Sequence, residues 1–421
     1  MQQCPLEQLD FAELVRPSEV IAWPQGPGEP LALTERLVAQ GPTLQRPTLL
    51  FGLTQSNTLQ PSVARDFGLH ALNGAGNSRR VTAVAEIFPA HLSALPRLFR
   101  SGDLRVDVCL VQVRPLADGQ FTLGVICDFT QAMLQKARLV VALLNPALPA
   151  MRGDTIVSAQ DIDVLVEGDE RILDLPDAEP STLEHAVAQR VAELIPDKAT
   201  VQLGVGTLPA AVALALRGHH GLGLHSGVVS DAVIDLIQRG VITNAHKGPD
   251  AGRTVTGGLF GTQRLRSFAE GSGLFDMRSA DYTHQLSVMA GLSKFHSINS
   301  GIEIDLSGQV NAEVAGGRYL GAVGGYVDFV RGAQVSPNGR SIIAFPSTTP
   351  DGRHSRIVAS LGERPVTAAR SDVDTVVTEH GVAHLRGCSL AERERRLIAI
   401  AHPEHRDALG RVSQQNKDLH S

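Results

Sequence analysis

Short apolar segments of strand length alternate with segments of helical periodicity along this chain. TLLFGL (48–53), VDVCLVQV (106–113), FTLGVI (121–126) and LVVALL (139–144) resemble strands that end at turn residues. A helix opened by Asp128 separates the last two. LVVALL has no polar alternation, which is typical of a strand covered on both faces. Strand, helix and strand in this order predict an α/β fold with open, mostly parallel sheets and flanking helices.

A capping box marks the most clearly predicted helix. Ser181 and Glu184 form the S-x-x-E pattern, and apolar residues follow at helical spacing up to residue 195. The alternation then restarts with TVQLGVG and LGLHSG as strands and PAAVALALR and DAVIDLIQRG as helices, and later with SIIAFP, RIVASL and TVVTEHG each as one strand. Because 421 residues suffice for at least two domains, we predict domains 1–180 and 181–421, the second beginning with a linker helix over 181–195.

Composition excludes several classes of protein. The formal net charge is −6 and aromatic residues make up 4% of the chain, so a nucleic-acid partner is not expected. No apolar stretch approaches the ~20 residues of a membrane span, and the N-terminus does not resemble a secretory signal. The four cysteines are far apart and no histidine spacing suits a metal, so we expect a cytoplasmic protein without disulfides or a metal site.

Two glycine-rich turns are candidate binding elements. In the first, Gly204 to Leu208 lead from a strand into a helix, where glycines and helix N–H groups can approach a phosphate or a thioester oxygen. A plain tight turn explains this segment equally well. Pro209 replaces the third glycine of a dinucleotide fingerprint, which disfavours a dehydrogenase. The second turn, GGRYLGAVGG (316–325), has five glycines in ten residues and can form a nest for an oxyanion.

A third candidate is the strand end LGLHSG (222–227), because open α/β sheets place their chemistry at the carboxyl ends of strands. His225 is a possible base and Ser226 a possible nucleophile. No acid partner is visible beside them, and a lone histidine is more often structural.

Taken together, the motifs of this sequence resemble the acetyl-CoA hydrolase/transferase family, which includes carboxylate CoA-transferases. The resemblance is carried by LLNPALPAMRGDT, QLGVGTLPAAV, LGLHSGVVSDAVIDLIQRGVIT, GGLFGTQRL, INSGIEIDLSGQVNAEVAGGR, GAVGGYVDFVRGA, SIIAFPSTTPDGRHSRIV and VDTVVTEHGVAHLRGCSLAERERRLIAIAHPEHRDAL. It is poorest over residues 1–105. It implies two tandem CoA-transferase-type α/β domains with the active site between them, and a homodimer without a permanent cofactor.

The resemblance also implies where coenzyme A binds. The turn contacting the thioester end would consist of Gly204, Val205, Gly206, Thr207 and Leu208. The loop at Gly324 and Gly325 would supply a backbone N–H, and Ile302, beside Glu303, would add a further contact. The substrate would be an acyl-CoA, with a carboxylic acid as the possible acceptor.

This sequence departs from the family pattern at its third motif. Members that transfer coenzyme A carry a glutamate there, which attacks the acyl-CoA and forms a covalent intermediate. The aligned residue here is Gly227, which has no side chain. The chain therefore hydrolyses an acyl-CoA with water in that space, uses another residue such as His225, Ser226 or Glu303, or binds CoA esters without catalysis.

Overall fold

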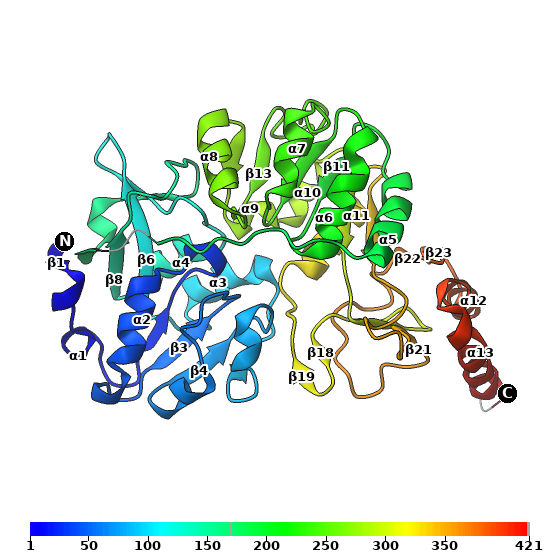
Figure 1. Ribbon diagram of the computed structural model, residues 1–421, viewed down its shortest axis with the longest axis horizontal. Coiled ribbons are helices and arrows are strands. Elements are labelled where there is room, and N and C mark those ends of the chain that lie inside the picture. Colours follow the sequence, from blue (N-terminus) through cyan, green and yellow to red (C-terminus); the bar gives the residue numbers. More distant parts are fainter. Residues whose placement is uncertain (169–170, 419–421) are drawn as a thin grey trace.

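The computed structural model describes residues 1–168 and 171–418. Two large sheets, one in each half of the chain, lie side by side with helices around them (Figure 1). The path β1-β10-β8-β6-β2-β3-β4-β5 of the first sheet is parallel throughout, and β7 adds antiparallel pairs with β6 and β9. Its strands are β1 (Gln2–Pro5), β2 (Val20–Ala22), β3 (Thr48–Phe51), β4 (Gly68–Ala71), β5 (Glu86–Ile87), β6 (Val108–Pro115), β7 (Phe121–Thr122), β8 (Leu139–Leu144), β9 (Ile156–Val157) and β10 (Val164–Glu167).

The second sheet has the order β14-β13-β12-β11-β15-β20-β22-β23 and is parallel except at its last pair. Its strands are β11 (Thr200–Gln202), β12 (Gly223–Ser226), β13 (Thr254–Thr256), β14 (Phe275–Met277), β15 (Phe295–Asn299), β20 (Arg340–Ala344), β22 (Thr375–Thr378) and β23 (Gly381–His384). Two small sheets contain β16 (Glu303–Asp305), β17 (Val310–Asn311) and β21 (Ile357–Val358), and β18 (Val314–Ala315) and β19 (Arg318–Tyr319). The predicted α/β fold with open, mostly parallel sheets is confirmed.

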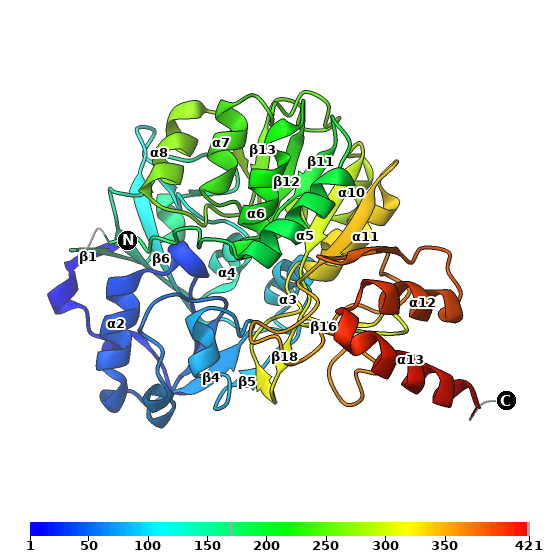
Figure 2. The same cartoon turned by 45° about the vertical axis from the view of Figure 1, so that its right-hand side comes forward.

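The first half contains α1 (Phe11–Leu14), α2 (Leu31–Ala39), α3 (Leu95–Ser101) and α4 (Thr130–Lys136). The second contains α5 (Thr182–Glu193), α6 (Thr207–Ala215), α7 (Ala232–Gln238), α8 (Gln263–Ser272), α9 (Ala280–Thr283), α10 (Leu286–Ala290), α11 (Tyr326–Val335), α12 (Leu390–Ile400) and α13 (Pro403–Asp418). Figure 2 shows α13 extending from the body towards the C-terminus. In the described ranges, no helix has both the length and the apolar character needed to cross a bilayer.

Apolar side chains cover both faces of the first sheet. Val141 of β8 belongs to one core cluster and Val140 to another on the opposite face. This agrees with the prediction made from LVVALL. The capping box of α5 is also present, since Ser181 Oγ accepts from the Glu184 N–H and the Glu184 carboxylate accepts from the Ser181 N–H.

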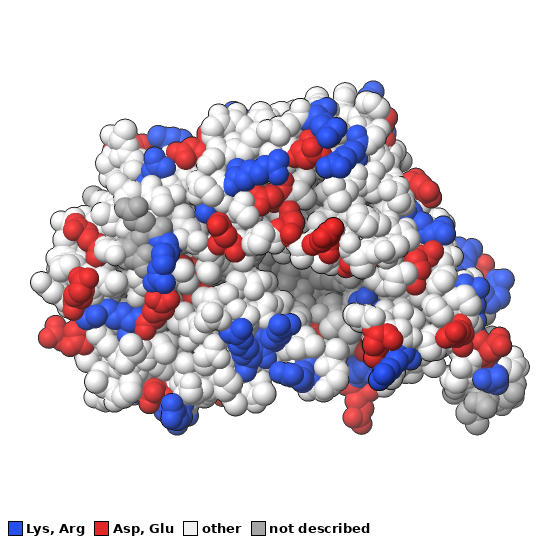
Figure 3. All heavy atoms as spheres, in the orientation of Figure 1, with Lys and Arg blue, Asp and Glu red and all other residues white. Residues whose placement is uncertain are grey.

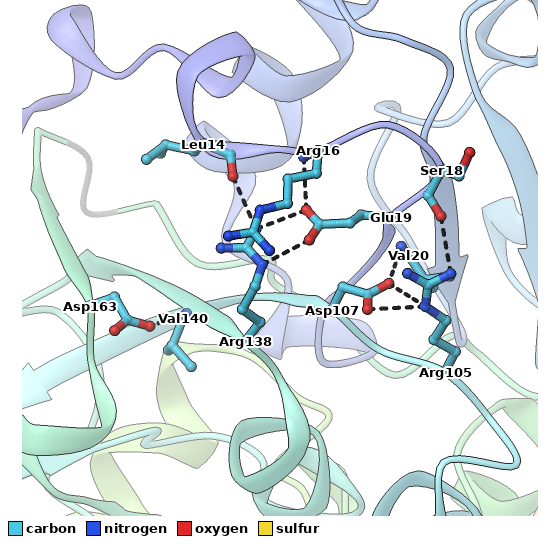
Figure 4. Close-up of polar contacts among 10 residues, drawn as sticks. All are labelled: Leu14, Arg16, Ser18, Glu19, Val20, Arg105, Asp107, Arg138, Val140 and Asp163. Atoms are coloured by element: carbon cyan, nitrogen blue, oxygen red, sulfur yellow. Dashed lines mark hydrogen bonds and ion pairs between the residues drawn. The ribbon is translucent and has the colours of Figure 1, made fainter.

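Acidic residues precede three strands of the first sheet (Figure 4). Glu19, Asp107 and Asp163 stand directly before β2, β6 and β10, and each carboxylate accepts a main-chain N–H at 2.8 Å. Arg138 donates to both oxygens of Glu19, each at 2.8 Å. These contacts fix the amino edge of the sheet.

Several predicted strands are shorter than expected, and RIVASL, for example, forms only the two-residue β21. FTLGVI forms only β7, because the chain after Thr122 leaves the sheet towards the second half, where Cys127 N donates to Gly257 O at 2.9 Å. TVVTEHG was predicted as one strand, but β22 ends at Thr378 and β23 returns antiparallel from Gly381. Gly381 has a φ of +154°, which permits this reversal.

Candidate active site

A cavity of about 240 Å³ lies where the two halves meet. The first half contributes Gln25, Leu92 and Asp128 to its wall. The second half contributes the ends of β11, β12 and β15, together with the loop before α11. Its members from the second half are Gln202, Leu203, Gly204, Ser226, Gly227, Val228, His284, Asn299, Ala322, Val323, Gly324, Gly325, Tyr326 and Phe329. We call this space the glycine cavity. The structure therefore brings together three glycines that lie far apart in the sequence: Gly204, Gly227 and Gly325.

Two larger cavities are lined by residues adjacent to those of the glycine cavity. One of about 510 Å³ is lined by Val205 to Pro209, by Glu184 and by Ser300, and one of about 1130 Å³ is lined by Ile302 and Glu303 among others. Asn299, Ser300 and Ile302 line the three cavities in turn, and Arg356 borders the second and third. In Figure 3 the surface is hollowed near its centre, below α5 and α6 as labelled in Figure 1, and basic side chains gather along the lower rim. The predicted coenzyme A contacts are distributed along this row.

The first glycine turn forms part of the second cavity. Gly206 has a φ of +118° and open space around the position of a Cβ, and α6 begins at the next residue. The Thr207 hydroxyl donates to the Glu184 carboxylate, which ties the turn to the capping box of α5. The N-terminus of α6 thus faces this cavity with its partial positive charge.

An imidazole occupies the space beside Gly227. A Cβ on Gly227 would lie 2.8 Å from Cε1 and 2.9 Å from Nε2 of His284, and a Cβ on Gly325 would approach Nε2 still more closely. The ring also packs on Phe329, with 4.5 Å between centroids. His284 therefore needs glycine at both positions, since no Cβ atom tolerates such contacts.

His284 is buried, and its Nδ1 lies 2.8 Å from Thr283 Oγ1. Burial lowers the pKa of the imidazole to about 3, with a further contribution from His225. The ring is therefore neutral near pH 7. Within the described residues, its Nε2 has no hydrogen-bond partner, and the side chain lines the glycine cavity.

His225 is placed differently. It is fully buried, its Nε2 donates to Thr283 O at 2.9 Å, and its ring meets Phe295 edge-on. It does not line the glycine cavity. Burial lowers its pKa to about 4, helped by Lys247.

Ser226 does line the glycine cavity, but its Oγ donates to Leu203 O at 2.6 Å. Its proton is thus held by the main chain. Glu303 borders the third cavity, where it accepts from Asn311 Nδ2 at 2.8 Å and pairs with Arg364. The structure does not bring Glu303 to Gly227.

Asp128 is a buried carboxylate in the wall of the glycine cavity. Gln25 Nε2 donates to its Oδ2 at 2.8 Å, and the Phe129 N–H donates to its Oδ1 at 2.6 Å. Burial raises its pKa to about 6 despite these bonds. From the sequence, Asp128 is expected only to open a helix, and His284 belongs to none of the candidate motifs. No short spacing connects either residue with Gly227.

Two family models match the chain, the acetyl-CoA hydrolase/transferase N-terminal domain over residues 79–175 and the C-terminal domain over residues 261–412. A 4-hydroxybutyrate coenzyme A transferase from Clostridium kluyveri is 41% identical over 77% of this chain and 76% of its own. A succinyl-CoA:cyclohexane-1-carboxylate CoA transferase from Geobacter metallireducens is 32% identical over 95% of this chain and 93% of its own. The chain belongs to the acetyl-CoA hydrolase/transferase family.

Solved structures agree with this membership. RipA from Yersinia pestis superposes with a TM-score of 0.92 at 28% identity, covering 99% of this chain and 98% of that one. A 4-hydroxybutyrate CoA-transferase from Porphyromonas gingivalis gives a TM-score of 0.84 at 32% identity, covering 99% and 98%. The predicted family and the prediction of an enzyme are thereby confirmed. Gly204 to Leu208 and Gly227 lie between the two matched ranges.

Proposed function

We propose that this protein hydrolyses an acyl-CoA thioester, with water as the acyl acceptor, in the glycine cavity. The observation that carries the proposal is the contact between Gly227 and His284. The glutamate implied by the family pattern is absent, and its Cβ would lie 2.8 Å from the imidazole. Covalent ping-pong transfer therefore has no nucleophile in its usual place.

The remaining carboxylate of the cavity is poorly suited to replace that nucleophile. Asp128 already accepts hydrogen bonds from Gln25, from the Phe129 N–H and from Thr130 Oγ1. Such bonds hold its oxygens and weaken them as nucleophiles. A space of about 240 Å³ can admit a small acyl group together with water, which favours direct attack by water.

Main-chain dipoles favour the reaction at the other side of the cavity. Gly325 is the N-cap of α11, so the helix directs its partial positive charge into the wall that Gly325 forms. Negative charge that develops on a thioester oxygen there is stabilised more than the ground state is. We place Gly204 to Leu208 along the thioester end of coenzyme A and Ile302 further along the same row of cavities.

A second candidate function is non-catalytic binding of CoA esters. The same missing carboxylate favours it, because both glycine turns are equally useful to a binder. The two candidates differ in chemistry and not in affinity, so a reaction assay distinguishes them.

The test is incubation of the pure protein with a panel of acyl-CoAs, with and without acetate or succinate, following free thiol and acyl exchange. Thiol release without an added carboxylate is the expected result. Exchange that needs the carboxylate would show transfer, and silence with measurable binding would show a binder. Either of these outcomes contradicts the proposal.

We also propose, from the family resemblance, a cytoplasmic homodimer with domains 1–180 and 181–421 and no permanently bound cofactor. Sedimentation velocity tests the dimer, for which a monomer at micromolar concentration is the contrary result. Limited proteolysis tests the boundary, where the first cut is expected near residue 180.

A further inference from the structure

The hydrogen bonds around His284 assign its tautomer. The Thr283 hydroxyl has one proton and donates it to Ser279 O at 3.1 Å. Its oxygen must therefore accept at the 2.8 Å contact with His284, so Nδ1 of the imidazole carries the proton. The other nitrogen, Nε2, then has a free lone pair. A hydroxyl that fixes one nitrogen of a histidine leaves the other ready to accept a proton.

That lone pair lies where the missing side chain would begin. Nε2 is 2.9 Å from the position of a Cβ on Gly227 and closer to that on Gly325. The carbonyl of a thioester held at Gly325 would therefore lie beside the imidazole. A water molecule between them is the only further participant that hydrolysis requires.

We propose that His284 is the general base of this hydrolysis, an inference that rests on the proposed function. Nε2 takes a proton from water as the water oxygen bonds to the thioester carbonyl carbon. The tetrahedral intermediate then collapses, the carbon–sulfur bond breaks, and the imidazolium returns its proton to the sulfur. The products are a carboxylic acid and free coenzyme A, and no other reactant is needed.

The low pKa of the His284 imidazole is compatible with this role. Burial holds the imidazole neutral near pH 7, so Nε2 keeps the lone pair that takes a proton from water. Negative charge that develops on the thioester oxygen favours the imidazolium. The base therefore strengthens as the transition state forms, which is the differential stabilisation that accelerates a reaction.

His284→Gln tests the proposal because it keeps a neutral polar side chain but cannot act as a base. We expect kcat for thiol release to fall by about 10²–10⁴-fold. Binding of a CoA thioether analogue, which cannot be hydrolysed, should stay within about twofold of wild type. His246→Gln is the matched control, because His246 is exposed and lines none of the three cavities.

His284→Ala supplies a readout that a structural role would not move. The substitution leaves a space between Gly227 and Gly325. Added imidazole should raise the rate of thiol release by His284→Ala at least tenfold over its rate without imidazole. Full activity of His284→Gln would overturn the inference while leaving the proposed function intact. Parallel loss of analogue binding, or failure of imidazole to restore folded His284→Ala, would also overturn it. If wild type released no thiol from any ester, both this inference and the proposed function would be overturned.

Discussion

At the scale of single residues, Gly227 and His284 form one unit. Glycine stands where the family pattern has a glutamate, and the imidazole of His284 occupies the space of that side chain. Gly227→Glu alone therefore forces a Cβ against the imidazole, and we expect a loss of about 1–3 kcal/mol in the free energy of unfolding without any gain of transfer. Urea denaturation measures the first effect and acyl exchange the second.

The double variant Gly227→Glu with His284→Ala removes the obstruction. We expect it to regain much of that stability and to form a glutamyl thioester that borohydride reduces, with exchange that depends on an added carboxylate. His284→Ala alone is the control, because it offers the same space without a nucleophile. Equal exchange in the single and double glutamate variants would contradict the steric argument.

His225 predicts how stability depends on pH. Its pKa is about 4 in the folded protein, because of burial and then Lys247, against about 6.5 unfolded. The unfolded chain therefore binds more protons between these values, and the histidine makes stability fall as the pH falls. His225→Gln should remove about 1 kcal/mol per pH unit of that dependence between pH 5 and 6.

Urea denaturation of wild type and His225→Gln at pH 5, 6 and 7 provides the measurement. His185→Gln is the control, because His185 is exposed on α5 and should leave the slope unchanged. An identical slope in wild type and His225→Gln would show that the buried imidazole does not account for the acid sensitivity.

Part of the site could be predicted at this scale and part could not. Gly204, Gly227 and Gly325 stand in motifs that a reader of the sequence can find. His284 lies 57 positions after Gly227 and Asp128 lies 99 before it. The packing of the second half brings His284 to Gly227, and the packing of the two halves adds Asp128 to the same cavity. No local pattern marks a residue whose role depends on a neighbour so distant in the chain.

At the scale of the elements, we expect a substitution at the amino edge of the first sheet to change stability but not catalysis. Glu19 is buried before β2 and accepts two hydrogen bonds from Arg138. Glu19→Gln should lower the free energy of unfolding by about 1.5–3 kcal/mol while leaving thiol release per folded molecule unchanged. Chemical denaturation and the thiol assay measure the two quantities, and Glu13→Gln, exposed on α1, is the control.

The pKa of Glu19 determines how its contribution to the free energy of unfolding changes as the pH falls. Burial alone would raise the pKa of Glu19, but the bonds from Arg138 and from the Arg16 N–H bring it below its ordinary 4.5. Its contribution is therefore complete above about pH 4.5 and is lost as the pH falls through the lower folded value. If the free energy of unfolding of wild type exceeds that of Glu19→Gln by the same amount at pH 2 as at pH 7, this assignment is contradicted.

The elements themselves were predictable where local rules decide them. β8 follows from its unbroken apolar run and α5 from its capping box. The segment 121–126 is a strand only at Phe121–Thr122, because Val125 and Ile126 pack in the core of the second half, where Ile126 forms an isolated bridge with Gly258. Apolar composition alone cannot distinguish these two kinds of burial.

At the scale of the whole molecule, the glycine cavity depends on how the halves are held together. Ser93 Oγ donates to Asp328 at 2.7 Å, and the neighbouring Leu92 N–H donates to Gly324 O at 2.9 Å. Ser93→Ala removes the first bond beside the cavity wall. We expect faster hydrogen exchange over residues 91–95 and 324–330, and a KM for the ester raised by roughly tenfold at most.

Exchange measured by mass spectrometry and initial rates across ester concentrations provide the readouts. Ser101→Ala, on the exposed end of α3, is the control. Unchanged exchange in both segments would show that this bond does not hold the halves in register.

Among the described residues, every strand of the first large sheet precedes α5 and every strand of the second follows it, so the crossing from one sheet to the other lies between β10 and α5. Because Gln25 and Asp128 come from one side of that crossing and the glycines from the other, each side carries only a fraction of the wall. A gene divided at this crossing would encode two polypeptides that must associate before either could form the complete cavity. The activity of such a two-chain form would be lost on dilution, and the concentrations of the two polypeptides would limit the reaction rate.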